Sequence, residues 1–423
     1  MLDLKFIREN IELVRTNIQN KNESTQVDNI LLLDESRRKI IQEVESLKNV
    51  RNVVTKEISE LKKNKENADD KIAAMKEVSD KIKSLDDALR NVENEIELVV
   101  LKIPNMTGEK VPVGKSAEDN KIVRTCGTTT EQKLKRNHIE IAKSLDIIDF
   151  ERGGKVSGSG FAFYKGKGAK LERAMINFMI DFHLDNHGYT ELLPPFIVNR
   201  NSMHGTGQLP KMAEDMYHAT EDDMFLIPTA EVPLTNFHNG EMLPTQSLPI
   251  KYCGYSPCFR REAGSYGKDV RGFLRVHQFN KVEMVNFVRP EDSWATLEKL
   301  TGEAEDIVKA LGLHYRVLLL CSGDTSFSSA MTYDIEVWSP GEESWLEVSS
   351  CSNFTDFQAR RANIRFKPDP SSKPEFIHTL NGSGLATSRI MVALLETYLN
   401  EDGSVSIPEA LVPYTGFSVI EAK

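Results

Sequence analysis

The chain has 423 residues, of which 40% are hydrophobic and 27% are charged, a composition typical of a globular protein. No apolar run approaches the roughly 20 residues that cross a bilayer, and the N-terminus lacks the apolar core of a signal peptide, so we expect a cytoplasmic protein with no membrane partner. The formal net charge of -10 argues weakly against a nucleic-acid partner, although the distribution of charge matters more than its sum.

The first predicted elements are helices. Apolar spacing predicts a short amphipathic helix over residues 7–18, followed by two longer helices, one starting near Asp34 or Ser36 and one ending before Pro104. Both long segments carry apolar residues in heptads, and the Asn-rich segment 63–69 between them is typical of a hairpin tip. Because a two-helix hairpin buries only one stripe of side chains, we expect an antiparallel coiled-coil arm attached to a larger domain.

The two long helices differ in charge. Residues 36–65 include nine Lys or Arg and four Glu, whereas residues 66–100 include five Lys or Arg and ten Asp or Glu. Ion pairs between the helices would explain this pattern, and so would a basic helix face that binds an RNA backbone. Both interpretations remain open at this point.

Residues 104–115 contain proline and glycine without periodicity and are interpreted as a linker between the helical region 1–103 and a body of residues 116–423. In the body, short β-branched runs alternate with turn residues and helical segments. Strands are predicted at 191–198, 282–288, 315–320 and 345–349, and helices at 169–187, 291–311 and 385–399. This pattern predicts an α+β fold around an antiparallel sheet.

The segment Cys258–Val285 is the most informative part of the body. Arg260 and Glu262 are predicted to share one face of a first strand, and Phe279 and Glu283 one face of a second. An arginine, a carboxylate and an aromatic ring on one sheet face suit a nucleotide, although an exposed hairpin with solvated arginines has the same pattern. No phosphate-binding P-loop is present, and the glycine-rich segment 153–160 is interpreted as a turn or a loop beside the site.

This segment resembles motif 2 of the class II aminoacyl-tRNA synthetases, in the form found in bacterial-type seryl-tRNA synthetases. Gly188–Phe196 is similar to motif 1, Asn381–Glu396 is similar to motif 3, and the N-terminal hairpin resembles the tRNA-binding arm of that family. The resemblance implies the class II antiparallel sheet surrounded by helices. It also implies an ATP-dependent ligase that activates L-serine as seryl-adenylate and transfers it to tRNA(Ser), possible charging of tRNA(Sec), and a homodimer formed through motif 1.

The resemblance further implies individual roles. The catalytic arginines would be Arg260, on the α-phosphate and the serine carboxylate, and Arg389, on the γ-phosphate. The serine-binding residues would be Thr229, Ala230, Glu231, Glu283 and Ser383. The ATP-binding residues would be Arg260, Arg261, Glu262, Arg271, Val276, Phe279, Glu347, Val348, Ser349, Ser350 and Arg389. Glu347 and Ser350 would ligate Mg²⁺ through oxygen, as a hard cation prefers.

Three alternatives belong to other classes of protein. A homologue that activates an amino acid and loads it onto a carrier protein would not need the full-length arm. A non-catalytic paralogue would not need Arg260, Glu283, Glu347 and Arg389 together. A purely structural coiled-coil protein would leave the turn-rich body unexplained.

Overall fold

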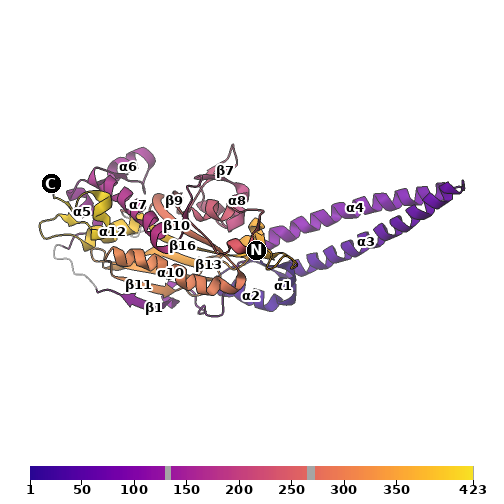
Figure 1. The fold of residues 1–423 in the computed structure, drawn as a ribbon, viewed down its shortest axis with the longest axis horizontal. Coiled ribbons are helices and arrows are strands. Elements are labelled where there is room, and N and C mark those ends of the chain that lie inside the picture. The colour runs from indigo at the N-terminus through magenta and orange to yellow at the C-terminus, as the bar shows by residue number, and fades with distance from the viewer. Residues whose placement is uncertain (129–134, 264–271, 423) are drawn as a thin grey trace. The chain divides into compact units, whose positions relative to one another are not determined.

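A computed structural model describes residues 1–128, 135–263 and 272–422 of the chain (Figure 1). The chain forms two compact units. One unit consists of Leu2–Gln19 and Glu23–Pro104, and the other of Met1, Asn20–Asn22 and Asn105–Lys423. In the described parts of the chain, no helix combines the length and the apolar character that crossing a membrane requires.

The helical unit begins with two short helices instead of the single predicted one. These helices are α1 (Leu4–Glu9) and α2 (Ile11–Asn20). Asn10 separates them because its backbone leaves the helical region, with φ of -132°, and its side-chain Nδ2 donates to the carbonyl oxygen of Phe6 over 3.0 Å. Asparagine commonly ends a helix in this way, by bonding to nearby backbone groups.

The two long helices, α3 (Asp28–Lys63) and α4 (Asp69–Val100), form an antiparallel hairpin (Figure 1). The predicted hairpin tip is confirmed, since α3 ends at Lys63 and α4 begins at Asp69. The predicted start of α3 near Asp34 or Ser36 is wrong. Asp34 does not cap the helix, because its buried carboxylate pairs with Arg8 over 2.9 Å and with Arg38 over 3.1 Å.

The heptad positions form the contact between α3 and α4. Val44, Ile82 and Ile96 are buried, and their heptad neighbours are partly buried between exposed flanks. Ion pairs between the helices also form, as Arg37 pairs with Glu93, and Lys48 with Asp86. The remaining interhelical pairs join Lys71 to Glu57 and Lys81 to Glu43. Pairing between the helices therefore accounts for part of the charge pattern.

The body is built on an eight-stranded sheet in the order β1-β11-β12-β13-β16-β10-β9-β4. Its strands are β1 (Lys121–Cys126), β11 (Tyr315–Leu319), β12 (Met331–Ser339), β13 (Ser344–Asn353), β16 (His378–Ala386), β10 (Gln278–Val288), β9 (Ile250–Phe259) and β4 (Thr190–Glu191). Every neighbouring pair is antiparallel except β4 and β9, which pair in parallel. The predicted α+β class with a mainly antiparallel sheet is confirmed.

Helices cover this sheet. The long ones are α7 (Lys167–His187), packed on β9 and β10, α10 (Ser293–Ala310), packed on β13 and β16, and α12 (Thr387–Thr397). The shorter helices are α5 (His138–Ser144), α6 (Phe150–Ser157), α8 (Arg200–Thr206), α9 (Glu231–Asn236), α11 (Phe357–Ala362) and α13 (Val412–Thr415). Small sheets join β2 (Ile148–Asp149) with β3 (Phe163–Tyr164), β5 (Ile197–Asn199) with β7 (Met224–Leu226) and β6 (His218–Ala219), β8 (Met242–Leu243) with β14 (Arg365–Phe366) and β15 (Glu375–Phe376), and β17 (Val405–Ser406) with β18 (Val419–Ile420).

Two local predictions in the body are wrong. The strand predicted at 191–198 is two separate strands, because Pro194 and Pro195 between β4 and β5 lack the N–H groups that a sheet requires. Most of the glycine-rich segment 153–160 is helical, since Asp149 caps α6 by accepting from the Arg152 N–H over 2.8 Å. Helix α6 ends at Ser157 and is capped by Gly158, whose φ of 95° suits glycine.

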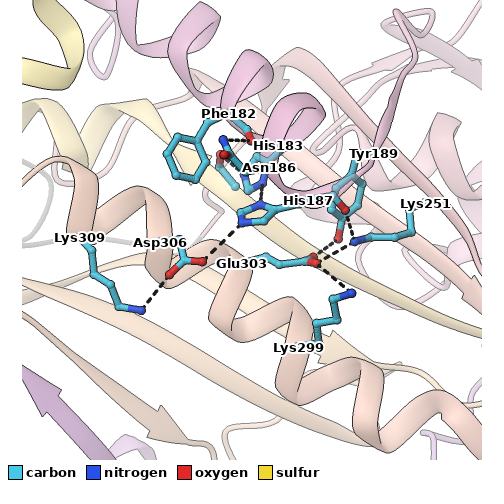
Figure 2. Close-up of polar contacts among 11 residues, drawn as sticks. Phe182, His183, Asn186, His187, Tyr189, Lys251, Lys299, Glu303, Asp306 and Lys309 are labelled. Atoms are coloured by element: carbon cyan, nitrogen blue, oxygen red, sulfur yellow. Dashed lines mark hydrogen bonds and ion pairs between the residues drawn. The ribbon is translucent and has the colours of Figure 1, made fainter.

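A buried polar cluster joins α10 to β9 and to the residue before β4 (Figure 2). The carboxylate of Glu303, on α10, accepts from the Tyr189 hydroxyl over 2.6 Å and pairs with Lys251, on β9, over 2.7 Å. The Lys251 ammonium also donates to the backbone oxygen of His187 at the end of α7. These contacts tie the edge of the sheet to the helices that cover it.

Candidate active site

A cavity of about 560 Å³ opens on one face of the sheet, where β10, β13 and β16 run side by side. Alternate residues of β10, namely Phe279, Lys281 and Glu283, line the cavity, as the two-residue period of a strand requires. On the opposite face, Cys351 and Gly382 pair across β13 and β16 and lie against α10. Helix α10 therefore supports this part of the sheet from the face opposite the cavity.

Most of the predicted site residues line the cavity. These residues are Thr229, Glu231, Arg260, Glu262, Val276, Phe279, Glu283, Glu347, Val348, Ser350, Ser383 and Arg389. Within the described residues, Ala230, Arg261 and Ser349 do not line it. Ala230 is buried behind the cavity, Ser349 donates from its hydroxyl to the Ser383 carbonyl oxygen over 2.6 Å, and Arg261 donates to the carbonyl oxygen of Glu214. Arg271 lies outside the described residues.

Arg260 and Glu262 reach the cavity by a different route from the predicted one. Strand β9 ends at Phe259, so the two residues do not alternate on a strand face, and Glu262 has a left-handed backbone with φ of 51°. The turn is held by hydrogen bonds to Asp215, which does not belong to a neighbouring strand of the sheet. Its carbonyl oxygen accepts from the Arg261 N–H, and its side chain accepts from the Ala263 N–H, over 2.9 and 3.0 Å.

One end of the cavity holds two buried carboxylates. Glu283 accepts a hydrogen bond of 2.5 Å from the Thr229 hydroxyl and forms an ion pair with Lys281. Glu231 accepts from the side-chain amide of Gln358 over 2.6 Å. Burial, together with the charge of Glu283, raises the pKa of Glu231 to about 7. This end of the cavity is therefore suited to a ligand that brings a positive charge and a hydroxyl group.

The other end carries arginines and an aromatic ring. The Arg260 guanidinium lies over the Phe279 ring, 5.2 Å from its centre, and Nε donates to the Pro228 carbonyl oxygen over 3.3 Å. Arg389, in the first turn of α12, donates from Nε to the Leu274 carbonyl oxygen over 3.1 Å. Two guanidinium groups beside a flat ring suit the phosphates and base of a nucleotide.

Oxygen ligands for a cation lie near Arg389. Arg389 Nη1 donates to the carbonyl oxygen of Glu347 over 2.9 Å and lies 3.6 Å from its carboxylate. The Ser350 hydroxyl donates to Asp334 over 2.6 Å, so its lone pairs are free to face a cation. Glu347 and Ser350 therefore offer the oxygen donors that Mg²⁺ prefers.

Several residues of this site were not named from the sequence, among them Lys281, Gln358 and Asp334. Lys281 lies between Phe279 and Glu283 at the same two-residue spacing, so the strand period could have identified it. Gln358 on α11 and Asp334 on β12 carried no local signal, because only the fold brings them to Glu231 and Ser350. Burial and the nearby charge of Glu347 raise the pKa of Asp334 well above its ordinary value.

Two protein families match parts of the chain. Residues 1–107 match the family described as the seryl-tRNA synthetase N-terminal domain. Residues 214–398 match the family described as the tRNA synthetase class II core domain (G, H, P, S and T). The second match includes the lining residues from β10, β13, β16 and the start of α12.

Full-length relatives are also similar. A serine–tRNA ligase of Chlorobium phaeobacteroides is 55% identical over 428 residues, which cover 100% of this chain and 99% of that protein. The crystal structure of seryl-tRNA synthetase from Pyrococcus horikoshii complexed with ATP superposes with a TM-score of 0.94 at 38% identity, over 100% of both chains. The cytoplasmic serine–tRNA ligase from Naegleria fowleri in complex with AMP superposes with a TM-score of 0.88 at 32% identity, over 100% of this chain and 99% of that one.

Proposed function

The chain belongs to the seryl-tRNA synthetase family, and we propose residue roles for the serine–tRNA ligase reaction that it catalyses. The observation that carries the activity is the 55% identity to a serine–tRNA ligase over the entire chain. The cavity on the open sheet face is the proposed site of both substrates, because it places buried carboxylates at one end and arginines at the other.

Serine binds at the carboxylate end. Glu231 receives the substrate ammonium, and Glu283 and Ser383 pair with the side-chain hydroxyl, while Thr229 fixes the Glu283 carboxylate. Lys281 pairs with Glu283, whereas Glu231 forms no ion pair among the described residues. A substrate ammonium would therefore balance the second negative charge. A site built to pair a hydroxyl group rejects alanine, which would leave buried polar groups unpaired.

ATP binds at the arginine end. In the activation step, the serine carboxylate oxygen attacks the α-phosphorus, and pyrophosphate leaves with the bonding electron pair. Arg260 contacts the α-phosphate, Arg389 contacts the γ-phosphate, and Phe279 stacks on adenine, with Glu262 and Val276 at its edge. These residues act by positioning the reactants and neutralising charge, since the reaction needs no covalent help from the protein.

Glu347 and Ser350 are the proposed ligands of Mg²⁺. Their oxygen atoms fit this ion, and the Ser350 hydroxyl directs its proton away toward Asp334. The bound ion would neutralise charge on the phosphate oxygens. Arg389 keeps the Glu347 backbone in place through its hydrogen bond to that carbonyl oxygen.

The helical unit is the proposed binding site for tRNA(Ser). Several cations of α3 and of the residues just after it form no ion pair with the part of the chain that the structure describes. They are Arg51, Lys56, Lys62, Lys63 and Lys65. All but Arg51 are exposed, which suits contact with an RNA backbone by charge and shape. After activation, the terminal ribose hydroxyl of the tRNA attacks the seryl carbonyl carbon, and AMP leaves.

A homodimer through the motif 1 segment is also proposed. Strand β4 is the last strand of the eight-stranded sheet, and Leu193, two residues beyond it, is 77% exposed. An exposed apolar side chain beside an unpaired strand edge favours contact with a second copy.

The cytoplasmic relative from Naegleria fowleri supports a cytoplasmic location.

The decisive experiment is ATP–pyrophosphate exchange with each of the twenty amino acids, with charging of tRNA(Ser) and tRNA(Sec) measured in parallel. We expect exchange with serine only, together with seryl-tRNA(Ser) formation. Serine exchange without any charging would indicate another acceptor, and no exchange with any amino acid would indicate a non-catalytic paralogue.

A further inference from the structure

His138, the first residue of α5, is fully buried and lies outside the substrate cavity. Asn137 caps the helix and fixes the His138 backbone, because its side chain accepts from the N–H groups of Ile139 and Glu140 over 3.1 Å each. The His138 ring accepts a hydrogen bond of 3.2 Å at Nε2 from the backbone N–H of Phe273. A buried histidine thus holds a peptide group of a segment that leads into the cavity.

This contact fixes the histidine tautomer. A backbone N–H can only donate, so Nε2 must carry the lone pair and Nδ1 the proton. Nδ1 lies 3.2 Å from a carboxylate oxygen of Glu342 and 3.4 Å from one of Glu396. Two carboxylates facing Nδ1 favour the tautomer that leaves Nε2 free to accept from Phe273.

The same three residues could be taken for a metal site, because their ligand atoms all lie within 4.8 Å of one another. The tautomer argues against this interpretation, since a metal would need the Nδ1 lone pair. Glu396 also accepts from the backbone N–H groups of His138 and Gly341, over 2.9 Å each, and from the Ser339 hydroxyl. The cluster is therefore a chain of contacts in which Glu396 accepts from the His138 backbone and the His138 ring accepts from Phe273.

Both ends of this chain belong to elements of the active site. Glu396 is near the C-terminal end of α12, and Arg389 is near its N-terminal end. Directly after Phe273, Leu274 accepts from Arg389 through its carbonyl oxygen, and Val276 lines the cavity. Segment 272–276 is therefore attached to α12 at two points, directly through Arg389 and indirectly through His138.

Gly272 shows how closely the ring approaches this segment. Its φ of 59° lies in the left-handed region, and a Cβ atom built on it would lie 2.0 Å from Nε2 of His138. Only glycine allows the imidazole to reach the backbone there. The close approach and the Phe273 hydrogen bond are independent observations of the same contact.

We propose that His138 is a positioning residue for ATP: it holds segment 272–276 so that Leu274, Arg275 and Val276 form their part of the nucleotide end of the cavity. The proposal rests on the proposed function, because it assumes that ATP occupies that end. It assigns His138 no contact with substrate. His138 acts through the Phe273 peptide group, which it holds, and through the adjacent Leu274 carbonyl oxygen, to which Arg389 donates.

Two substitutions separate this role from a general structural one. In His138→Gln, the side-chain oxygen can reach the Nε2 position and accept from Phe273, whereas His138→Asn reaches only the Nδ1 position. If the loss of one such hydrogen bond is passed on to ATP binding, the affinity for ATP falls about tenfold. We expect His138→Asn to raise the KM for ATP about tenfold with little change in the KM for serine, and His138→Gln to restore most of the affinity for ATP.

Amide hydrogen exchange tests the contact without using activity. Exchange in the peptide that contains Phe273 should become faster in His138→Asn and stay slow in His138→Gln, while peptides from β16 remain unchanged in both variants. Equal changes in the KM for ATP and for serine, or unchanged exchange at Phe273 in His138→Asn, would overturn the proposal. Failure of the unmodified chain to activate serine would instead overturn the proposed function, so the two failures are distinguishable.

Discussion

Nε2 of His183, on α7, donates a hydrogen bond of 3.1 Å to the carbonyl oxygen of Gly384, on β16. Since a carbonyl oxygen only accepts, Nδ1 of His183 carries the lone pair, and it accepts from Nδ1 of His187 over 2.9 Å (Figure 2). A Cβ atom on Gly384 would lie 2.4 Å from Nε2, so glycine is required for this approach. Gly384 follows Ser383, which lines the cavity, and α7 therefore supports the proposed serine-binding end of β16 from behind.

We expect His183→Leu to be less stable than the unmodified chain by about 1–3 kcal/mol, because it leaves a buried carbonyl oxygen without a donor. His183→Gln should recover much of this loss, since its amide can donate to Gly384. Urea unfolding at pH 7.5 measures both free energies. Equal stability of the two variants would show that the hydrogen bond to Gly384 contributes little.

The pH dependence of stability gives a second test of His183. Burial lowers the pKa of His183 from 6.5 to about 3. Between these two values the unfolded chain binds more protons than the folded chain, so stability falls as the pH drops from about 6.5 toward 3. His183→Gln cannot titrate, and its unfolding free energy should fall less over this range. An unchanged slope would assign the loss to other groups.

The buried charge of Glu231 should lower the stability of the folded chain while it serves to bind serine. Its pKa is raised to about 7, so the folded chain holds the proton more tightly than the unfolded chain, and stability falls as the pH rises from about 4.5 through 7. Glu231→Gln removes this buried charge, and we expect it to be more stable at pH 8 by up to about 3 kcal/mol, with no gain near pH 4.5.

The same charge should appear in the kinetics. For the unmodified chain, the KM for serine should rise as the pH falls below about 7, because protonated Glu231 no longer attracts the serine ammonium. Pyrophosphate exchange as a function of serine concentration measures this, and Glu231→Gln should lose exchange at every pH. A serine KM that does not vary between pH 6 and 8 would contradict the assignment.

Arg260→Ala should strongly reduce adenylate formation without unfolding the chain. The Arg260 guanidinium forms one hydrogen bond, to the Pro228 carbonyl oxygen, and one ring contact, with Phe279, among the described residues, so few structural interactions are lost. Removing a group that neutralises charge in the transition state lowers kcat by about 10²–10³-fold. Arg261→Ala is the matched control, because that guanidinium donates to Glu214 outside the cavity. Near-normal exchange in Arg260→Ala would exclude the assigned role.

Local periodicity predicted the parts of this fold in which each element follows its own spacing. The tip between Lys63 and Asp69 follows from its polar, Asn-rich composition between two heptad runs, and the shared face of Phe279 and Glu283 follows from residue spacing. The start of α3 could not be predicted in this way. Asp34 is of a residue type that commonly caps helices, but here it pairs with Arg8, a residue from another helix. Such a pairing depends on tertiary structure and leaves no trace in local spacing.

The candidate site shows the same division. The motif residues could be named from the sequence by resemblance, yet the strand predicted to carry Arg260 and Glu262 ends at Phe259. Asp215 holds this turn from 45 or more residues earlier in the chain. Gln358 likewise reaches Glu231 across 127 positions of sequence. Long-range contacts of this kind decide the charge and geometry of the cavity, and periodicity does not contain them.

Leu193→Asp should weaken the proposed dimer. Leu193 is 77% exposed beside the edge strand β4, and a charge there would be buried without a partner in a dimer formed through this edge. Sedimentation velocity should show a shift toward the monomer. Val156→Asp is the matched control, since Val156 on α6 is 69% exposed and lies outside this segment. A monomeric unmodified chain, or an unchanged dimer in Leu193→Asp, would contradict an interface at this edge.

The exposed lysines at the end of α3 provide the test of the RNA-binding face. Replacing Lys56, Lys62, Lys63 and Lys65 by alanine should raise the KM for tRNA(Ser) and reduce its dependence on salt, because each lost phosphate contact removes one counterion release. Serine-dependent pyrophosphate exchange should not change. These lysines belong to the helical unit, whereas the residues that line the cavity belong to the other unit.

A control on the acidic helix makes this test specific. Lys76 and Lys83 of α4 are also exposed and form no ion pair among the described residues, but they lie on the helix with surplus negative charge. Replacing these two by alanine should change tRNA charging much less than the α3 substitutions do. Equal effects from both helices would mean that overall charge, rather than a basic face on α3, determines tRNA binding.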